Sequence, residues 1–218
     1  MTGAQAHGGA MNLVSVGTGL IYRRAPASGR LFQGEILAQV AELRPSYEKP
    51  AAGQSDRIVG SELLVHTLAI VASQDCDLEQ DWAKREGELH KETDLPCITL
   101  YQLGMAEAVL AKLAGGDIRK QVQNNKNERY QYLAPVPPAA DADGEGLDAT
   151  CIDFKRCFAI PTVELYRQIR AGVPVPTKRR ACLNTPWVEH LQNRIAAYMS
   201  RIPLSELHFT PEARRPQT

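Results

Sequence analysis

Apolar and β-branched residues occupy nearly every position of residues 63–72 (LLVHTLAIVA). Because this run lacks the polar alternation of a half-exposed strand, it predicts a central strand that is covered on both faces. Residues 78–88 follow with a helix-forming composition, so the pattern predicts a strand–turn–helix unit in which Ser73 or Asp75 is the helix N-cap. The turn itself is a dense cluster of reactive side chains: Ser73, Gln74, Asp75, Cys76 and Asp77.

The other periodic segments are shorter. Alternating or β-branched residues predict further strands at 13–22, 33–40, 96–101, 130–133, 150–153, 157–160 and 178–183. Apolar residues at helical spacing predict helices at 105–114, 117–122, 162–170 and 186–201. Proline, glycine and charged residues between 44 and 60 predict a long surface loop. Strands thus dominate the early part of the chain, and helices the late part.

This order of elements predicts the α+β class. We expect a small, strongly bent sheet or an SH3-like, partly closed barrel, with helices packed on one side and a long C-terminal helix. A doubly wound sheet ranks second, because βαβ alternation does not run the length of the chain. Residues 1–12 are predicted to be disordered and 205–218 to form a loose tail. Between them, 13–204 form a single domain, with a barrel-like core at 13–160 and a helical part at 161–204.

Charge and cysteine content narrow the function classes. The 218 residues carry 25 basic and 25 acidic side chains, so nucleic-acid binding would need a local basic patch. No apolar run reaches the roughly 20 residues of a membrane span, and the first residues lack the features of a signal peptide. The five cysteines contain no CxxC pair. We therefore expect a cytoplasmic protein with free thiols.

The polar cluster at residues 73–77 offers the best candidate chemistry. Cys76 could be a nucleophile or a metal ligand, and Asp75 and Asp77 could bind a metal or act as bases. The sequence places no histidine next to the cluster. His66 lies on the predicted strand, and an extended strand would put it more than about 20 Å from Ser73. In the other interpretation, the two aspartates cap the helix and Cys76 packs into the core. No metal site and no cofactor are predicted, because the cluster lacks a fourth ligand.

Basic residues interleaved with tyrosine form a second candidate region. Lys126, Arg129 and Tyr130 lie close together in sequence, and Lys178 to Arg180 form another basic group. Such a pattern could bind single-stranded nucleic acid through charge and stacking. A solvated face with core tyrosines would give the same pattern. His66, within the apolar run, is interpreted as a hydrogen-bonded core histidine.

Several fragments together resemble a widespread bacterial family of largely uncharacterised proteins, over about residues 31–204. They are FQGEI at 32–36, AIVASQDCDLE at 69–79, ERYQYL at 128–133, IDF at 152–154 and the last helix at 180–201. The family's corresponding motifs are QGDI, VLSQSCDLE, ERxxYL, VDF and a final RxxLxxPxxEHL helix. The resemblance brings no established activity with it.

The strand at 68–77 is also similar to the RPVVVLSND strand of PemK/MazF-type toxins. Those toxins are small SH3-like barrels that cleave RNA, so the similarity implies a barrel and an RNA-cleaving ancestry. His66 and Thr67 stand where the toxin motif carries Arg-Pro. That arginine belongs to the toxins' RNA-cleaving chemistry, and the departure puts ribonuclease activity in doubt.

Two function hypotheses follow. In the first, the chain is a non-enzymatic binding or regulatory module of a bacterial toxin–antitoxin or phage-defence assembly, and contacts a partner protein encoded nearby or a nucleic acid. In the second, it is a PemK/MazF-like nuclease or other hydrolase that uses Asp75, Cys76 and Asp77. The predicted binding residues are Ser73, Gln74, Arg129, Tyr130, Asp153 and Arg180.

Overall fold

The computed structural model describes residues 20–48, 57–88 and 91–200. The predictions for 1–12 and 205–218 fall outside these ranges. Strands and helices are both present, so the α+β class is confirmed. Among the described residues, no helix has the length and apolar character needed to cross a membrane.

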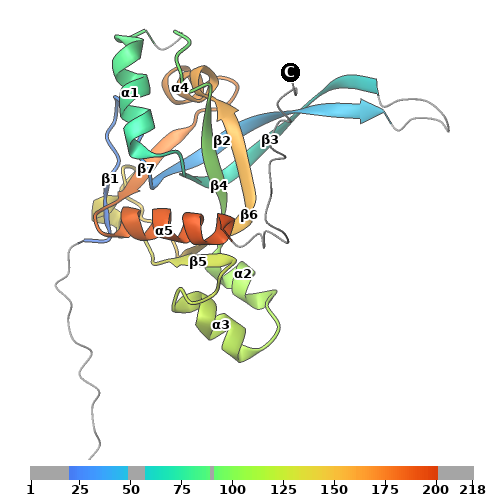
Figure 1. Cartoon of the computed structure of the whole chain (residues 1–218), viewed down its shortest axis with the longest axis vertical. Coiled ribbons are helices and arrows are strands. Elements are labelled where there is room, and N and C mark those ends of the chain that lie inside the picture. The colour runs from blue at the N-terminus through green and yellow to red at the C-terminus, as the bar shows by residue number, and fades with distance from the viewer. Residues whose placement is uncertain (1–19, 49–56, 89–90, 201–218) are drawn as a thin grey trace, which may run out of the picture.

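Seven strands form one sheet, in which all neighbouring strands are antiparallel (Figure 1). Their order across the sheet is β1 (Tyr22–Arg24), β7 (Lys178–Leu183), β2 (Glu35–Glu48), β3 (Arg57–Val71), β4 (Cys97–Met105), β6 (Thr150–Pro161) and β5 (Tyr130–Leu133). The sheet is open, because β1 and β5 lie at its two edges. The predicted SH3-like barrel is therefore not confirmed.

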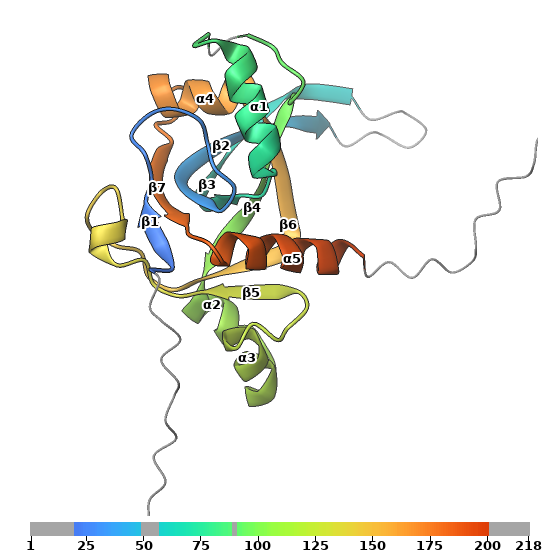
Figure 2. The same cartoon turned by 60° about the vertical axis from the view of Figure 1, so that its left-hand side comes forward.

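Helices cover both faces of this sheet. They are α1 (Asp75–Arg85), α2 (Ala106–Ala111), α3 (Gly116–Gln123), α4 (Thr162–Ala171), α5 (Trp187–Met199) and the 3₁₀ turn η1 (Pro138–Ala140). Leu78 of α1 and Leu165 of α4 pack into one core cluster, and Leu191 of α5 packs into another. In Figures 1 and 2, α1 and α4 lie together at one end, α2 and α3 lie beyond β5, and α5 crosses between them. The prediction that helices pack on one side only is wrong.

The central strand is covered on both faces only at 68–71. The prediction is wrong for the first part of the run, because Leu63 and Val65 are exposed. Leu68 and Ile70 of β3 point into the cluster under α5, whereas Ala69 and Val71 point into the cluster under α1 and α4. Because successive side chains of a strand point to opposite faces, a strand covered on both faces must be apolar at every position. The strand–turn–helix unit is confirmed as β3 followed by α1.

The predicted surface loop at 44–60 is wrong at 44–48 and 57–60, and its middle, 49–56, lies outside the described residues. β2 continues to Glu48 and β3 begins at Arg57, so the two strands form a long hairpin. Pro45 is compatible with this, because proline is tolerated in a strand whose outer edge has no partner. The predicted break at 154–156 is also absent, since β6 runs through it with a register shift opposite β4.

Beyond Gln39 the hairpin rotates relative to the rest of the sheet. Gln39 has a positive φ of 58°, which is unusual for a residue other than glycine. Residues two apart in a regular strand face the same side, yet Ala38 belongs to the cluster under α5 and Val40 to the cluster under α1 and α4. We call residues 41–47 and 59–65 the ribbon, because there β2 and β3 pair only with each other.

Candidate functional site

The junction between β3 and α1 is fixed by its neighbour β4. The Ser73 hydroxyl accepts a hydrogen bond from the backbone N–H of Thr99 at 2.9 Å, and the N–H of Ala72 donates to the Thr99 carbonyl at 2.8 Å. Gln74 is the N-cap residue, and its side chain makes no capping bond. The predicted capping by Ser73 or Asp75 is wrong, because both side chains are bonded elsewhere.

Asp75 is held by an arginine from the loop before β2. Arg30 donates two hydrogen bonds to its carboxylate, both at 2.9 Å, and the backbone N–H of Gln33 donates a third at 3.2 Å. These bonds, those from Arg30 above all, lower the pKa of Asp75. The Arg30 guanidinium also lies 4.1 Å from the centre of the Phe32 ring. Asp75 is therefore an ionised carboxylate whose oxygens are already engaged within the chain.

Cys76 and Asp77 face solvent at the first turn of α1. The interpretation in which Cys76 packs into the core is wrong, because Leu78 is the first residue of α1 that is buried. The Cys76 sulfur contacts only Gln74 and Asp77 oxygens, each at the long distance of 3.7 Å. Among the described residues, the Cys76 thiol thus has only these two long contacts, with side chains that are themselves exposed.

Arg129, Tyr130 and Asp153, by contrast, are brought together by the pairing of β5 with β6. Tyr130 is directly opposite Asp153 in the register. Arg129, which precedes β5, donates from Nε and Nη2 to the two carboxylate oxygens of Asp153, at 2.8 and 2.6 Å. Its guanidinium also lies 4.8 Å from the Tyr130 ring centre. Burial raises the pKa of Asp153, but the bonds from Arg129 and from the N–H of Lys155 outweigh it, so the pKa is lowered.

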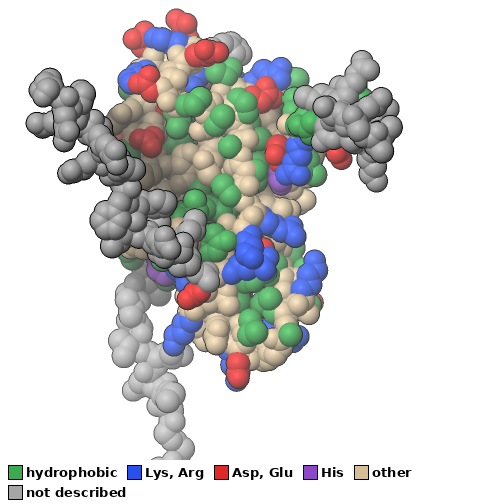
Figure 3. All heavy atoms as spheres, turned by 45° about the vertical axis from the view of Figure 1, so that its right-hand side comes forward, with side chains coloured by type: hydrophobic (Ala, Val, Ile, Leu, Met, Phe, Trp, Pro, Cys, Tyr) green, Lys and Arg blue, Asp and Glu red, His purple; other side chains and the backbone are tan. Residues whose placement is uncertain are grey.

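These residues line an open groove of about 270 Å³ between β6, the end of β4 and α2, which we call the basic groove. Arg156 lies 3.8 Å from Asp153 and donates to Gln102 at 3.2 Å, and Lys112 extends the wall from the end of α2. The groove is thus lined by three cationic side chains and a single carboxylate, and two of the cations, Arg129 and Arg156, lie beside that carboxylate. Figure 3 shows Lys and Arg side chains gathered on this side of the molecule, toward its lower half.

Sequence reasoning missed Arg156 and Lys112. The strands predicted at 150–153 and 157–160 leave Arg156 between them, where its direction has no fixed relation to Asp153. In β6 the register opposite β4 is irregular between 152 and 157, and Arg156 and Asp153, three residues apart, line the same groove. Lys112 comes from a helix about 40 residues earlier in sequence, so only the tertiary fold reveals it.

The structure places Asp77 and the basic groove at different ends of the molecule. Asp77 lies on α1 beside Gln80 and Lys84, whereas Arg129 and Asp153 lie beside β5 (Figure 1). The two sets of predicted residues therefore do not form one site.

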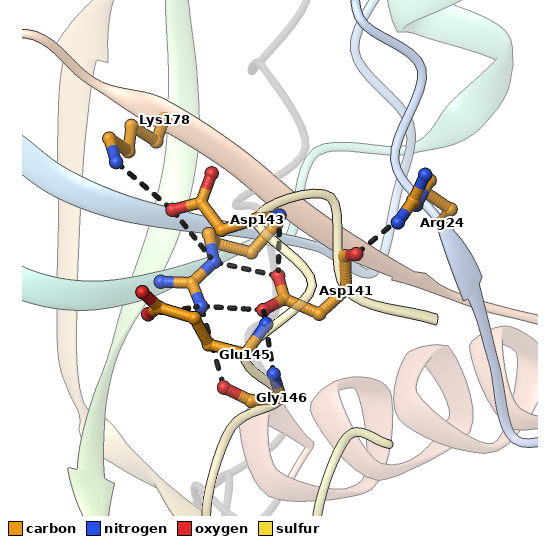
Figure 4. Close-up of polar contacts among 7 residues, drawn as sticks. Arg24, Asp141, Asp143, Glu145, Gly146 and Lys178 are labelled. Carbon is orange, nitrogen blue, oxygen red and sulfur yellow. Dashed lines mark hydrogen bonds and ion pairs between the residues drawn. The ribbon is translucent and has the colours of Figure 1, made fainter. Parts of the chain in front are cut away.

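Arg180 is engaged in a buried cluster of its own (Figure 4). It donates from Nε and Nη2 to the carboxylate of Asp141, both at 2.7 Å, and the Asp141 side chain is completely buried. Asp143 and Glu145 lie 3.6 and 3.9 Å from the same guanidinium. The loop that carries these acids is thereby attached to β7, and the guanidinium makes its bonds within the chain.

A sequence signal could have found this cluster. The spacing D-x-D-x-E-G at 141–146 matches the first half of a calcium-binding loop, in which positions 1, 3 and 5 face the ion and position 6 is glycine. Gly146 has a positive φ of 80°, and its N–H donates to Asp141 at 2.9 Å, as does that of Glu145 at 3.1 Å. Here Arg180 stands where that pattern places a cation.

Protonation of Asp141 at low pH should weaken its ion pair with Arg180. Hydrogen bonding to Arg180 lowers the pKa of Asp141 from 3.8 to about 2. A carboxyl group whose folded-state pKa is lowered contributes stability that is complete above its unfolded pKa and is lost as the pH falls through its folded value. The free energy of unfolding of the wild type, minus that of Asp141→Asn, should be constant above about pH 5 and fall by about 2 kcal/mol between pH 4 and 2.

Urea titrations at each pH would measure this difference, and carboxylates common to both proteins cancel in the subtraction. A difference that does not change between pH 5 and 2 would show that Asp141 is not held as an ionised group.

Comparison with protein-family models, with curated proteins and with solved structures gave no match. Within the described part of the chain, no group of three or more His, Cys, Asp and Glu side chains is arranged to hold a metal ion. The family resemblances drawn from the motifs therefore remain predictions.

Proposed function

We propose that this chain is a non-enzymatic binding module that holds a segment of single-stranded nucleic acid in the basic groove. The proposal is carried by one observation: an open groove is lined by three cationic side chains, Lys112, Arg129 and Arg156, with a single carboxylate and a tyrosine ring.

Local charge supports an anionic ligand. The chain as a whole is neutral, with 25 basic and 25 acidic residues, but the groove combines three cations with only Asp153 as a counter-charge. The side chains of Arg156 and Arg129 are 63% and 42% exposed, so both remain accessible to a ligand. Phosphate groups bind such clusters through charge and hydrogen bonds.

An aromatic wall favours a nucleic acid over a simple anion. Tyr130 is half-buried and lines the groove, with the Arg129 guanidinium over its ring. A nucleotide base stacks on tyrosine or on an arginine plane without regard to sequence, whereas inorganic phosphate gains nothing from such a surface.

The cellular setting of the proposal comes from the sequence resemblance. A cytoplasmic toxin–antitoxin or phage-defence assembly would supply both a nucleic acid and a partner protein. The PemK/MazF-like nuclease alternative has less support from the geometry. Asp75 is engaged by Arg30, and the exposed Cys76 and Asp77 lie apart from the basic groove.

Charge reversal in the groove should reduce nucleic-acid binding. For Arg156→Glu combined with Lys112→Glu, we expect the affinity for a fluorescent single-stranded oligonucleotide to fall at least about tenfold at low salt, because two phosphate contacts become repulsive. For the wild type, three contacts at about 0.7 counterions each predict a slope of about −2 in log K against log salt concentration. Fluorescence anisotropy measures both quantities.

A matched control is Lys84→Glu, which reverses an exposed lysine on α1. Its affinity should equal that of the wild type. Equal affinity of the groove variant and the wild type, or binding by the wild type that does not depend on salt, would contradict the proposal.

A further inference from the structure

The ribbon exposes a row of large apolar side chains away from the basic groove. Leu43 and Leu63 are directly opposite each other in the register, and Ala41 and Val65 form the next pair on the same face. Tyr47 follows Leu43 at even spacing, and Val59 lies at the register shift beside it. The exposed fractions are 60% for Leu43, 56% for Tyr47 and Val59, 43% for Leu63 and 37% for Val65.

Charged residues are confined to the other face of the ribbon. Glu42 and Arg44 alternate with Leu43 along β2, and Arg44 is opposite Glu62. Glu42 accepts hydrogen bonds from Arg44 at 2.9 Å and from His66 at 2.8 Å. The apolar face therefore contains no charged side chain between residues 41 and 47 or between 59 and 65.

An apolar groove continues this face at the base of the ribbon. It has a volume of about 370 Å³ and lies between the ribbon, the end of β6 and the start of α4. Ala41, Leu43 and Leu63 form one wall, and Pro161, Val163 and Pro174 contribute to the other. Three polar residues, Glu42, Glu164 and Gln168, also line it. The exposed apolar surface thus extends from the distal end of the ribbon to the body of the protein.

At the base of the ribbon, Gln168 of α4 accepts a hydrogen bond from the Ala41 N–H at 3.0 Å and donates one to the Ala41 carbonyl at 2.9 Å. Beyond Ala41 the ribbon has only its own two strands. β7 pairs with β2 only at residues 35–38, and β4 pairs with β3 only at 69–71, so in the ribbon neither strand has a third neighbour. An isolated two-stranded hairpin is only marginally stable in water. A single exposed leucine is normal, but a contiguous apolar face on a two-stranded hairpin indicates a contact surface.

We infer that the apolar face of the ribbon is the interface of a homodimer, in which the ribbons of two copies pack face to face. Two hairpins stacked about 10 Å apart form a two-layered β-sandwich, which buries one face of each. The inference does not depend on the proposed binding of nucleic acid.

A second copy fits this surface better than a charged partner. In an isologous contact the same patch meets itself, so the patch must contain no net charge that would repel its copy. The ribbon face is uncharged, and the two carboxylates at the groove have partners within the chain: Glu42 accepts from Arg44, and Glu164 from Arg167. The whole chain has equal numbers of basic and acidic residues. With a two-fold axis near the Leu43–Leu63 pair, antiparallel ribbons place Tyr47 and Val59 of each copy over the apolar groove of the other.

Sedimentation velocity of the full chain tests this inference. We expect the wild type at 1–100 μM to sediment as a species of twice the 24.0 kDa chain mass. Leu43→Arg and Leu63→Glu should each give the single-chain mass, because each buries a charge against its symmetry mate. Glu62→Lys, an exposed change on the opposite face, should remain a dimer.

A variant at the distal end of the ribbon separates loss of the dimer from unfolding of the chain. Tyr47 and Val59 belong to none of the core clusters, so Tyr47→Ser with Val59→Ser should keep the circular dichroism spectrum and thermal transition of the folded chain. This variant should raise the dimer dissociation constant at least tenfold. A wild type that remains monomeric at 100 μM, or a dimer that none of these apolar-face changes weakens, would overturn the inference.

Discussion

Replacing Arg180 with methionine should lower the free energy of unfolding by about 3–5 kcal/mol. Asp141, whose side chain is completely buried, would lose both hydrogen bonds from the guanidinium and its counter-charge. Methionine matches the aliphatic part of arginine, so packing changes little. The cost is that of leaving an ionised carboxylate in the interior without a counter-charge, bonded only to the backbone N–H groups of 143, 145 and 146. Urea denaturation of wild type and variant would measure it.

Two comparisons separate this effect from the loss of any basic residue on β7. Lys178→Met removes the pair with Asp143, in which the lysine is 58% exposed, and should cost at most about 1 kcal/mol. The double variant Arg180→Met/Asp141→Asn should recover part of the loss, because it removes the unpaired charge as well. A loss below 1 kcal/mol for Arg180→Met would contradict the structural role of this pair.

Arg179→Met should also cost about 3–5 kcal/mol. Arg179 donates two hydrogen bonds to Glu35, whose side chain is completely buried, and others to the carbonyls of Gly29 and Arg30. Burial raises the pKa of Glu35 in spite of this partner. Arg179 therefore holds both the start of β2 and the loop before it. That loop carries Arg30, which donates to Asp75.

A double-mutant cycle with Glu35→Gln isolates the Glu35 part of this loss. We expect the double variant to be more stable than the sum of the single losses predicts, because each single change leaves the other side chain without its hydrogen bonds. Strict additivity within 0.5 kcal/mol would show that the two side chains do not interact in the folded protein.

The sequence predicted the elements that local pattern determines. An apolar side chain at every position of 68–71 requires two covered faces, and the following polar cluster requires a turn, so β3 and α1 were found. The ribbon was missed because Pro45, Gly60 and the charges near them have the composition of a loop. What keeps 44–48 and 57–60 extended is pairing across the hairpin, which composition does not reveal.

The candidate site was predicted in part for the same reason. Arg129 and Tyr130 were recognised from basic residues beside tyrosines, and Asp153 from a motif. That Arg129 and Asp153 bond to each other follows from the β5–β6 register, which depends on a hairpin closed by the loop at 134–149. Arg156 and Lys112 needed the tertiary fold. Arg180 has the same basic character in sequence, yet burial turns it into an internal partner of Asp141.

Mapping where nucleic acid touches the chain tests the proposed function most directly. The wild type would be irradiated with single-stranded RNA that contains 4-thiouridine, and crosslinked peptides would be identified by mass spectrometry. Binding in the basic groove predicts crosslinks in 128–133, with Tyr130 as the principal residue, and in 151–156. Crosslinks confined to α1 or to the ribbon, or no crosslink at saturating RNA, would contradict it.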